Sequence, residues 1–351
     1  MSRRTLASVL AIVLLVALCA TVAFLPVPYV TMSPGPTVNV LGKNNGQPIV
    51  QVQGHKTYPV DGDLRLTTVS VTAPGQRITL PAALWAWFDG ARAVYPRDVI
   101  YPPQQSAAES EQESSVEMVS SQDTAVAAAL HELGYRLPLR VEIVDVTKGA
   151  PADGKLRPHD RVIEVGGQPI TDVSQVSKAI QRAGVGTPTQ VVVRRGGVER
   201  TFTVTPKASP DDPTKAVIGV QIQPGYDFPF DVAVRLGDDI GGPSAGLIFS
   251  LGVYDTLTPG SLTGGTDIAG TGTITADGRV GPIGGIQQKI VAAADAGAKL
   301  FFVPPRNCDD ALKADVKKGE ITLVKATTMH SAVESLKTYA RDKSAALPSC
   351  R

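Results

Sequence analysis

One serine in the C-terminal third of the chain has surroundings that suit nucleophilic catalysis. The loop from Gly241 to Gly246 reads GGPSAG, with Ser244 directly before a segment of helical apolar spacing. The first N–H groups of a helix have no partner within the helix, so a serine at this junction has hydrogen-bond donors close by. Such donors can bind the oxyanion of a tetrahedral intermediate. The loop therefore predicts a nucleophile together with part of its oxyanion hole.

Lys289 is the matching candidate for the general base. It follows a glycine-rich stretch that ends at Gly285 and lies near the start of an alanine-rich predicted helix, between Ile286 and Ile290. A lysine on a mostly apolar face loses hydration, which lowers its pKa and lets the neutral amine accept the serine proton. An ordinary lysine stays protonated near pH 7, so this desolvation is a physical requirement of the predicted Ser–Lys pair.

Three motifs in this region resemble the proteolytic domain of the Lon family, whose members use a Ser–Lys dyad. The family's Pro-Ser-Ala-Gly is present at residues 243–246, and its glycine hairpin leading to the lysine runs from Thr271 to Lys289. A strand ending in a Pro-x-x-Asn-like turn follows at residues 301–307, and the serine and lysine are 45 residues apart, close to the family's spacing. The resemblance implies that Ser244 and Lys289 are catalytic and that Thr271 supports them.

The chain departs from that family in two respects. Gly241 stands three residues before the nucleophile, where many members carry an acidic residue, and Asp239 is the nearest acidic substitute. The phosphate-binding pattern G-x-x-x-x-G-K-[ST] does not occur in the sequence, so the ATPase of classical Lon enzymes is missing from it. We therefore expect an ATP-independent endopeptidase without cofactors, acting on unfolded or flexible polypeptides.

Residues 117–206 resemble a PDZ domain of the kind attached to bacterial proteases. The signals are a small-Pro-Ala run at residues 149–156 and a V-G-G-x-x-I hairpin at residues 165–170, followed by a predicted helix and two predicted strands. A PDZ domain binds an extended peptide at a sheet edge, and residues 134–137 are the candidate loop for its terminal carboxylate. This loop departs from the family's Gly-Leu-Gly-Phe form, so a structural spacer without a ligand is the alternative.

The N-terminus predicts a membrane anchor. Arg3 and Arg4 precede an uncharged run from Thr5 to Leu25, which as a helix spans about 31 Å, roughly the hydrocarbon thickness of a bilayer. The two arginines favour a cytoplasmic N-terminus and place the rest of the chain outside the cytoplasm. A cleaved signal peptide is the alternative. In an oxidising compartment Cys308 and Cys350 either form a disulfide or remain two free thiols.

Taken together, these signals predict an α+β protein with a transmembrane helix, a PDZ-like domain and a Lon-type proteolytic domain. The expected layout is a cytoplasmic N-terminus at 1–4, an anchor at 5–25, a β-rich segment at 27–116, the PDZ-like domain at 117–206, the proteolytic domain at 216–340 and a tail at 341–351. It resembles the membrane-bound Lon-like proteases with a PDZ domain found in Gram-positive bacteria. Because 216–340 is short for a Lon proteolytic fold, we expect strands such as residues 64–72 to complete it, with the PDZ segment inserted. By analogy with Lon rings, a homo-oligomer is expected.

Other function classes receive less support. A net charge of +1 offers no electrostatic basis for a nucleic-acid partner. His55, His131 and His159 are scattered without ligand spacing, so no metal site is expected. Residues 242–246 also match the G-x-S-x-G elbow of α/β-hydrolases, for which Asp309 and His330 would complete a triad. A catalytically inactive, tethered PDZ scaffold is the non-enzymatic alternative.

Overall fold

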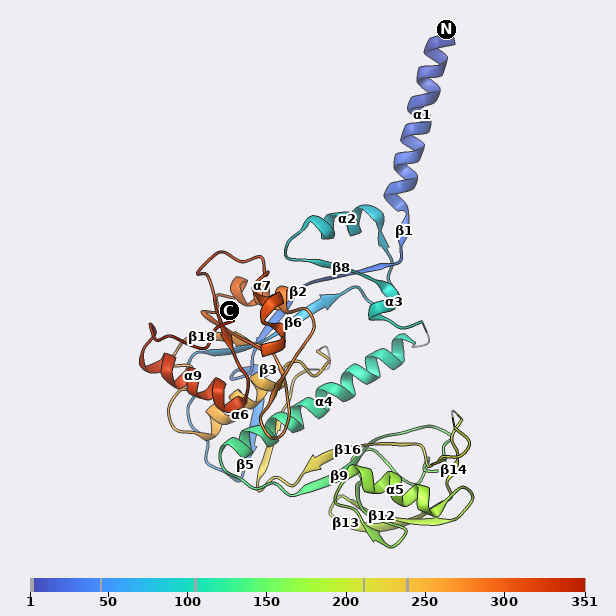
Figure 1. Ribbon diagram of the computed structural model, residues 1–351, viewed down its shortest axis with the longest axis vertical. Coiled ribbons are helices and arrows are strands. Elements are labelled where there is room, and N and C mark those ends of the chain that lie inside the picture. Colours follow the sequence, from blue (N-terminus) through green and yellow to red (C-terminus); the bar gives the residue numbers. More distant parts are fainter. Residues whose placement is uncertain (1–2, 45, 104–105, 211, 238–239, 351) are drawn as a thin grey trace. The chain divides into compact units, whose positions relative to one another are not determined.

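The structure is a computed structural model that describes residues 3–44, 46–103, 106–210, 212–237 and 240–350. It contains both helices and strands, and the predicted α+β class is confirmed (Figure 1). Residue contacts divide the chain into two compact units. The larger unit comprises residues 1–51, 56–132 and 233–351, and the smaller unit comprises residues 52–55 and 133–232.

A six-stranded mixed sheet forms the centre of the larger unit. Its order is β22 (Thr322–Lys325), β21 (Leu300–Val303), β18 (Asp267–Gly270), β6 (Asp63–Val71), β2 (Tyr29–Asn39) and β8 (Ala93–Pro96). The first four strands are parallel, whereas β2 is antiparallel to both of its neighbours. Strands β2, β6 and β8 precede residue 133 and the other three follow residue 233. The sheet therefore joins two segments that lie far apart in the sequence.

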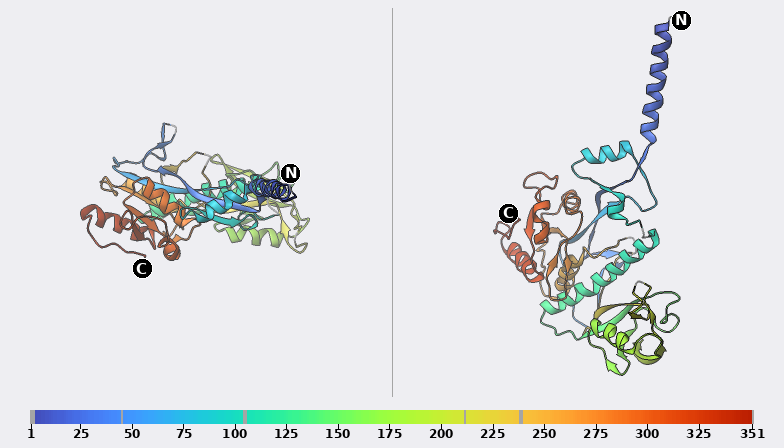
Figure 2. Two further views of the ribbon diagram at one scale, coloured as in Figure 1. Left: turned by 90° about the horizontal axis from the view of Figure 1, so that it is seen from above. Right: turned by 45° about the vertical axis from the view of Figure 1, so that its right-hand side comes forward.

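The helices of the larger unit pack against this sheet or against one another. The central one is α6 (Gly246–Leu257), in which every residue except Thr256 is buried. It contacts β6 and β18, and also α4 (Ala107–Glu132) and α9 (Met329–Arg341), which lie beside it in Figures 1 and 2. Helix α7 (Ile286–Asp295) packs against β2 and β6. Because α6 is mostly apolar around its whole circumference, it must be covered on all sides, and the neighbouring elements cover it.

Helix α4 differs from the sequence-based expectation. Residues 104–121 are acidic and rich in serine and glutamine, a composition that predicts a surface connection followed by a short helix. Gln104 and Gln105 lie outside the described residues, and from Ala107 the chain is instead one helix of 26 residues. Residues 125–130, which are alanine, valine and leucine, are buried. The predicted boundary between residues 116 and 117 falls inside this helix, and its contacts assign all of it to the larger unit.

The smaller unit is built on an antiparallel sheet of the order β13 (Val198–Val204), β12 (Thr189–Arg195), β10 (Arg161–Val165), β9 (Leu139–Val146) and β16 (Val220–Tyr226). A short strand, β11 (Gln168–Pro169), pairs with β10. Helix α5 (Val173–Ala183) begins at a capping box made by Asp172 and Gln175. The turn between β12 and β13 uses Gly196 and Gly197, both with positive φ, as a tight hairpin requires.

Helix α1 (Arg3–Phe24) has no buried residue. It is long and apolar enough to cross a membrane, a test that signal sequences also pass. The remaining short elements are β1 (Pro26–Val27), β3 (Lys43–Asn44), β4 (Gln47–Pro48), β5 (Val50–Gln53), β7 (Ile78–Thr79), α2 (Leu80–Phe88), α3 (Arg97–Ile100), β14 (Lys207–Ala208), β15 (Ala216–Val217), β17 (Asp231–Val234), β19 (Thr273–Ile274), β20 (Val280–Gly281), η1 (Pro305–Asn307) and α8 (Cys308–Ala311).

A disulfide joins α8 to the C-terminal tail. Cys308 and Cys350 are bonded, with their Cα atoms 5.1 Å apart, so the structure decides between the two alternatives left open by the sequence. The adjacent residue Ser349 forms a β-bridge with Val324 of β22. The tail is thereby held against the edge of the larger sheet.

Candidate active site

Ser244 lies in a loop that α4 holds in place at the start of α6. The N–H of Gly242 donates to the carbonyl of Ser114, with a nitrogen–oxygen distance of 3.0 Å. The hydroxyl of Ser121 donates to the carbonyl of Pro243 at 3.1 Å. Helix α6 begins two residues after Ser244, which is the loop-to-helix junction that the motif predicts. Both contacts come from a helix that the sequence analysis did not connect with the site.

A second segment holds the backbone of Ser244 itself. Its carbonyl accepts hydrogen bonds from the N–H of Gly272 at 2.8 Å and from the hydroxyl of Thr271 at 3.0 Å. The N–H of Leu247 donates in turn to the carbonyl of Gly272 at 3.0 Å. The nucleophile loop and the chain leaving β18 are therefore joined by reciprocal hydrogen bonds, and Thr271 lies next to the predicted dyad.

Lys289 is positioned by the glycine that precedes its helix. Gly285 has φ 67° and ψ 33°, the left-handed conformation, immediately before the first turn of α7. A Cβ at this position would lie 2.7 Å from Val69 of β6 and 2.8 Å from Met32 of β2. Because glycine has no side chain, the start of α7 can approach both strands closely. Lys289, in the first turn, is consequently only 3% exposed.

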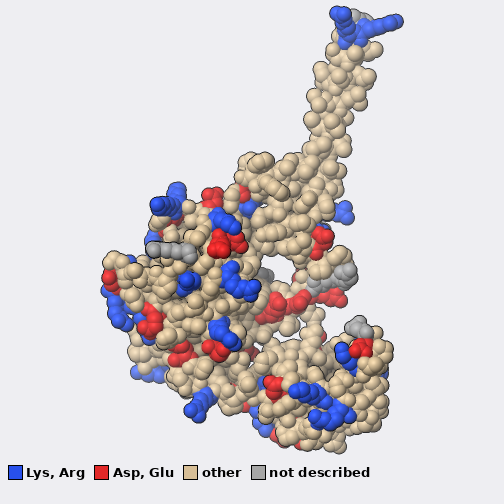
Figure 3. All heavy atoms as spheres, viewed as in Figure 1, with Lys and Arg blue, Asp and Glu red and all other residues tan. Residues whose placement is uncertain are grey.

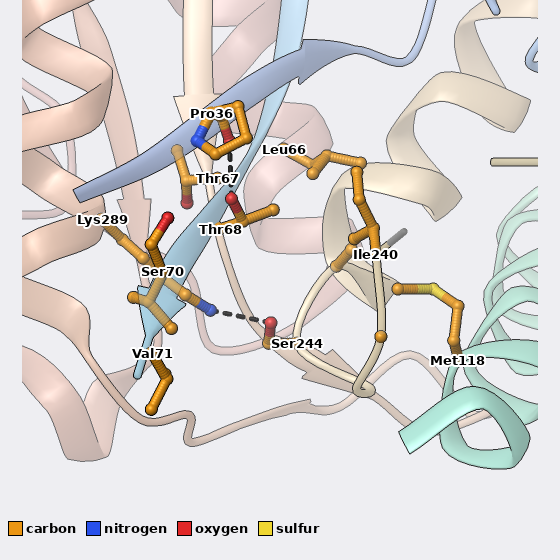
Figure 4. Close-up of a pocket in the computed structure, with 13 residues that line it drawn as sticks. Pro36, Leu66, Thr67, Thr68, Ser70, Val71, Met118, Ile240, Ser244 and Lys289 are labelled. Carbon is orange, nitrogen blue, oxygen red and sulfur yellow. Dashed lines mark hydrogen bonds between the residues drawn. The ribbon is translucent and has the colours of Figure 1, made fainter. Parts of the chain in front are cut away.

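The structure brings the two predicted residues together. Lys289 Nζ donates to Ser244 Oγ at 2.7 Å (Figure 4). It also donates to Thr271 Oγ1 at 3.3 Å. Burial lowers the pKa of Lys289 from 10.5 to about 8, because the interior solvates the charged ammonium poorly. At pH 7 about one molecule in ten then carries a neutral amine, against about one in three thousand at the ordinary pKa.

The pair opens into a pocket of about 420 Å³. Its lining residues are Pro36, Leu66, Thr67, Thr68, Val69, Ser70, Val71, Met118, Ile240, Gly241, Ser244, Ala245 and Lys289. One wall is the second half of β6, where Thr67 to Val71 continue beyond the residues that pair with β18. The opposite edge of this half-strand pairs with β2 as far as Val71. An extended strand therefore borders the pocket directly beside Ser244 and Lys289, as Figure 4 shows.

Asp309 and His330, which would complete a hydrolase triad with Ser244, do not contact this serine in the structure. His330 is exposed on α9 and pairs with Glu132 at 2.7 Å, and this hydrogen bond and charge raise the pKa of His330. Asp309 is exposed on α8. The oxygen of Ser244 is contacted by the lysine amine instead. Asp239, the acidic residue considered as a substitute near the nucleophile, lies outside the described residues.

Sequence reasoning missed the part of α4 that lines the site. Ser114, Met118, Ser121 and Ala125 lie at intervals of three and four residues and are buried or half-buried, which is the stripe of one helix face. Three of these four side chains are small, and the residues between them are mostly polar and include Glu117 and Asp123. This helical spacing is visible in the sequence, but the serine-rich and acidic composition of the segment is typical of a linker and predicts no helix there.

The smaller unit places the expected peptide-binding loop next to a strand that has partners on both edges. Residues 134–137 lead into β9, which pairs with β10 on one edge and with β16 on the other. The side chain of Tyr135 contacts His55, with 3.1 Å between its hydroxyl oxygen and the ring nitrogen. Strand β16 instead lies at the end of the sheet and contacts α5. A peptide added to this sheet next to α5 would pair with β16.

Two family models match parts of this chain. Residues 238–337 match the model of the Lon protease (S16) C-terminal proteolytic domain, and residues 113–205 match that of the PDZ domain. Lon protease from Campylobacter concisus is 42% identical over 83 residues, which is 22% of this chain and 10% of that protein. Lon protease from Mycolicibacterium smegmatis is 42% identical over 69 residues, 20% of this chain and 9% of the relative. The matched part thus spans about a tenth of these relatives.

Among solved structures, the PDZ domain of an SdrC-like protein from Listeria innocua is similar to part of this chain. The match is 20% identical and covers 24% of this chain and 93% of that domain, with a TM-score of 0.22. The family matches confirm the resemblance that the motifs carry: the chain contains a Lon-type proteolytic domain and a PDZ domain.

Proposed function

We propose that this protein is an ATP-independent serine endopeptidase in which Ser244 is the nucleophile and Lys289 is the general base. The observation that carries the proposal is the 2.7 Å contact between the serine oxygen and a lysine amine that is 3% exposed. The match of the surrounding residues to a Lon proteolytic domain supports it. The catalytic domain would consist of both chain segments that build the larger sheet, with the PDZ domain inserted between them.

The geometry supports a simple proton cycle. The neutral amine of Lys289 takes the hydroxyl proton of Ser244 as Oγ bonds to the carbonyl carbon of the scissile peptide. The N–H groups of Ser244 and Ala245 are the candidate donors to the oxyanion, since the N–H of Leu247 is already bonded to Gly272. As the C–N bond breaks, the ammonium of Lys289 protonates the leaving amine. A water molecule then attacks the carbonyl carbon of the ester and gives a proton to the neutral amine of Lys289. The ester C–O bond breaks, Lys289 passes that proton to Ser244 Oγ, and the product leaves as a carboxylic acid.

A polypeptide in extended conformation fits the pocket. Residues 67–71 of β6 border it, and an extended substrate lying along them would pass beside Ser244 Oγ. A substrate that pairs with this strand through main-chain hydrogen bonds can have many different sequences, but the paired segment must be unfolded. We therefore propose unfolded or flexible polypeptides as substrates.

Helix α1 and the PDZ domain suggest where the protein is located and how it recognises peptides. We propose that α1 anchors the chain in the membrane and that both domains lie outside the cytoplasm, because Arg3 and Arg4 favour a cytoplasmic N-terminus. We further propose that the PDZ domain binds an extended peptide at β16, beside α5. The order of the sheet and the contact of β16 with α5 support this edge rather than the loop at residues 134–137.

The test is cleavage of a permanently unfolded, fluorescently labelled polypeptide by the full-length protein in detergent. Ser244→Ala and Lys289→Ala should each reduce kcat/KM by roughly a thousandfold or more, because either change removes the unit that transfers the proton. The matched control is Lys299→Ala, which removes an exposed lysine a few residues after α7 and should leave the rate unchanged. Retained cleavage by Ser244→Ala would refute the assignment.

A further inference from the structure

A short aromatic helix at the end of the anchor is exposed in an unusual way. Helix α2 spans Leu80–Phe88 and reads LPAALWAWF, without a charged residue. Its two buried residues are the alanines Ala83 and Ala86. The large side chains point away from the protein: Leu84 is 50%, Trp85 71%, Trp87 71% and Phe88 84% exposed. Soluble proteins normally bury most of their tryptophan and phenylalanine and seldom expose several large apolar side chains together.

The chain ties this helix to the foot of α1. Strands β1 and β7 pair with Pro26 opposite Thr79 and Val27 opposite Ile78. The N–H of Leu80, the first residue of α2, donates to the carbonyl of Leu25 at 2.9 Å. The end of α1 and the start of α2 are therefore hydrogen-bonded neighbours. Figure 1 shows α2 close to the end of α1. Figure 3 shows the same region as a surface without charged side chains at the base of the α1 column.

We propose that α2 is an interfacial helix that inserts its aromatic face into the headgroup region of the bilayer in which α1 is anchored. The inference rests on the proposed anchoring by α1. If α1 spans the hydrocarbon, its end at Phe24 lies at the membrane surface, and the hydrogen bond from Leu80 places α2 at that depth. Tryptophan is the side chain that membrane proteins concentrate there, because its ring is apolar and its N–H is polar. The lipid surface is thus the partner that fits both composition and position.

The consequence is a second membrane contact next to the first. A single helix leaves a soluble domain free to swing about its exit point. Helix α2 contacts β8 and β2, the two strands at one end of the catalytic sheet. An α2 held in the interface would therefore fix these strands, and the larger unit with them, at a defined orientation to the membrane.

The test uses the protein's own tryptophans, since Trp85 and Trp87 are the two that the sequence contains. The full-length chain is placed in nanodiscs of phosphatidylcholine and phosphatidylglycerol that carry lipids brominated either close to the headgroup or near the acyl-chain ends. We expect most of the tryptophan emission to be lost with the shallow quencher and little with the deep one. Tryptophan emission that is unchanged by both brominated lipids but quenched by acrylamide in the aqueous phase would overturn the inference.

Protection from acrylamide without quenching by either lipid would also overturn it, because a second protein copy would then cover α2. A variant that keeps the probes sharpens the result: Phe88→Ser should weaken shallow quenching and shift the emission toward that of water-exposed tryptophan. The matched control is Leu312→Ser, which changes a 57%-exposed residue on another part of the surface and should leave quenching unaltered.

Failure of the anchor is measured separately. Cys19 is the free cysteine and lies within α1. Protection of Cys19 from a water-soluble maleimide, together with unquenched tryptophans, would refute the interfacial helix and leave the anchor intact. Labelling of Cys19 in nanodiscs would refute the anchor and the inference together. Peptide cleavage in the same sample, compared with Ser244→Ala, reports on the proposed activity independently of both.

Discussion

At the scale of single residues, the site depends on how poorly one amine is hydrated. Lys289 contacts two hydroxyls, those of Ser244 and Thr271, and burial is the cause that lowers its pKa to about 8. A hydroxyl neighbour solvates an ammonium weakly compared with water, so the neutral form is favoured. The same residue on the surface of α7 would have no catalytic use near neutral pH.

The pH dependence of cleavage follows from this pKa. The general base must be neutral, so kcat/KM should rise with pH through an apparent pKa of about 8 and level off above it. The measurement is kcat/KM for a short flexible peptide from pH 6 to pH 10, with the protein checked for folding at each end. A flat profile, or one that rises through the ordinary lysine value of 10.5, would contradict the role given to Lys289.

At the scale of elements, the approach of α7 to the sheet decides whether that amine is buried. Gly285 makes the approach possible, because a side chain there would collide with Val69 and Met32. Helix α4 positions the nucleophile, because Ser114 and Ser121 form hydrogen bonds with the loop that carries Ser244. The loop of Ser244 is thus held by α4 and the amine of Lys289 is placed by α7, two different helices.

Two adjacent glycines allow a matched test of this packing. Gly285→Ala introduces a Cβ at φ 67° within 2.8 Å of two side chains, and the left-handed conformation alone costs about 1–2 kcal/mol. We expect a lower midpoint of chemical unfolding and a fall in kcat of at least tenfold, because the first turn of α7 must shift. Gly284→Ala meets no atom within 4 Å and should behave like the wild type. Equal effects of the two changes would contradict this account.

At the scale of the whole molecule, the catalytic unit depends on residues from both sides of the PDZ domain. Its sheet takes β2, β6 and β8 from before residue 133 and β18, β21 and β22 from after residue 233. Strand β18 has β6 as one of its two partners, and β6 also supplies the pocket wall. The second segment alone would expose the edge of a buried parallel strand.

A fragment that begins at Ala216 should therefore fail to fold. It retains Ser244 and Lys289 but lacks half of the sheet, so we expect no cooperative thermal transition by circular dichroism and no peptide cleavage. A fragment beginning at residue 27, which retains both segments, is the control and should be folded. A stable and active fragment from Ala216 would show that the first segment is dispensable and that the PDZ domain is not inserted.

The sequence by itself determined the features that are local in the chain. The nucleophile loop, the glycine hairpin before Lys289 and the α5 region are recognisable because turns, caps and periodicity depend on residues a few positions apart. The alternation of apolar and polar residues at 139–146 likewise predicts a strand, and β9 has these bounds. The order and spacing of the motifs also predicted that Ser244 and Lys289 lie close together.

Only the tertiary structure decided the features that depend on distant contacts. The burial of Lys289 requires β2 and β6, more than 200 residues earlier, and the loop of Ser244 requires α4, whose small residues are typical of a linker. The pairing of Cys308 with Cys350 and the outward face of α2 are likewise invisible in local patterns. The physical reason is that hydration, and with it the pKa, is set by everything that surrounds a group in space.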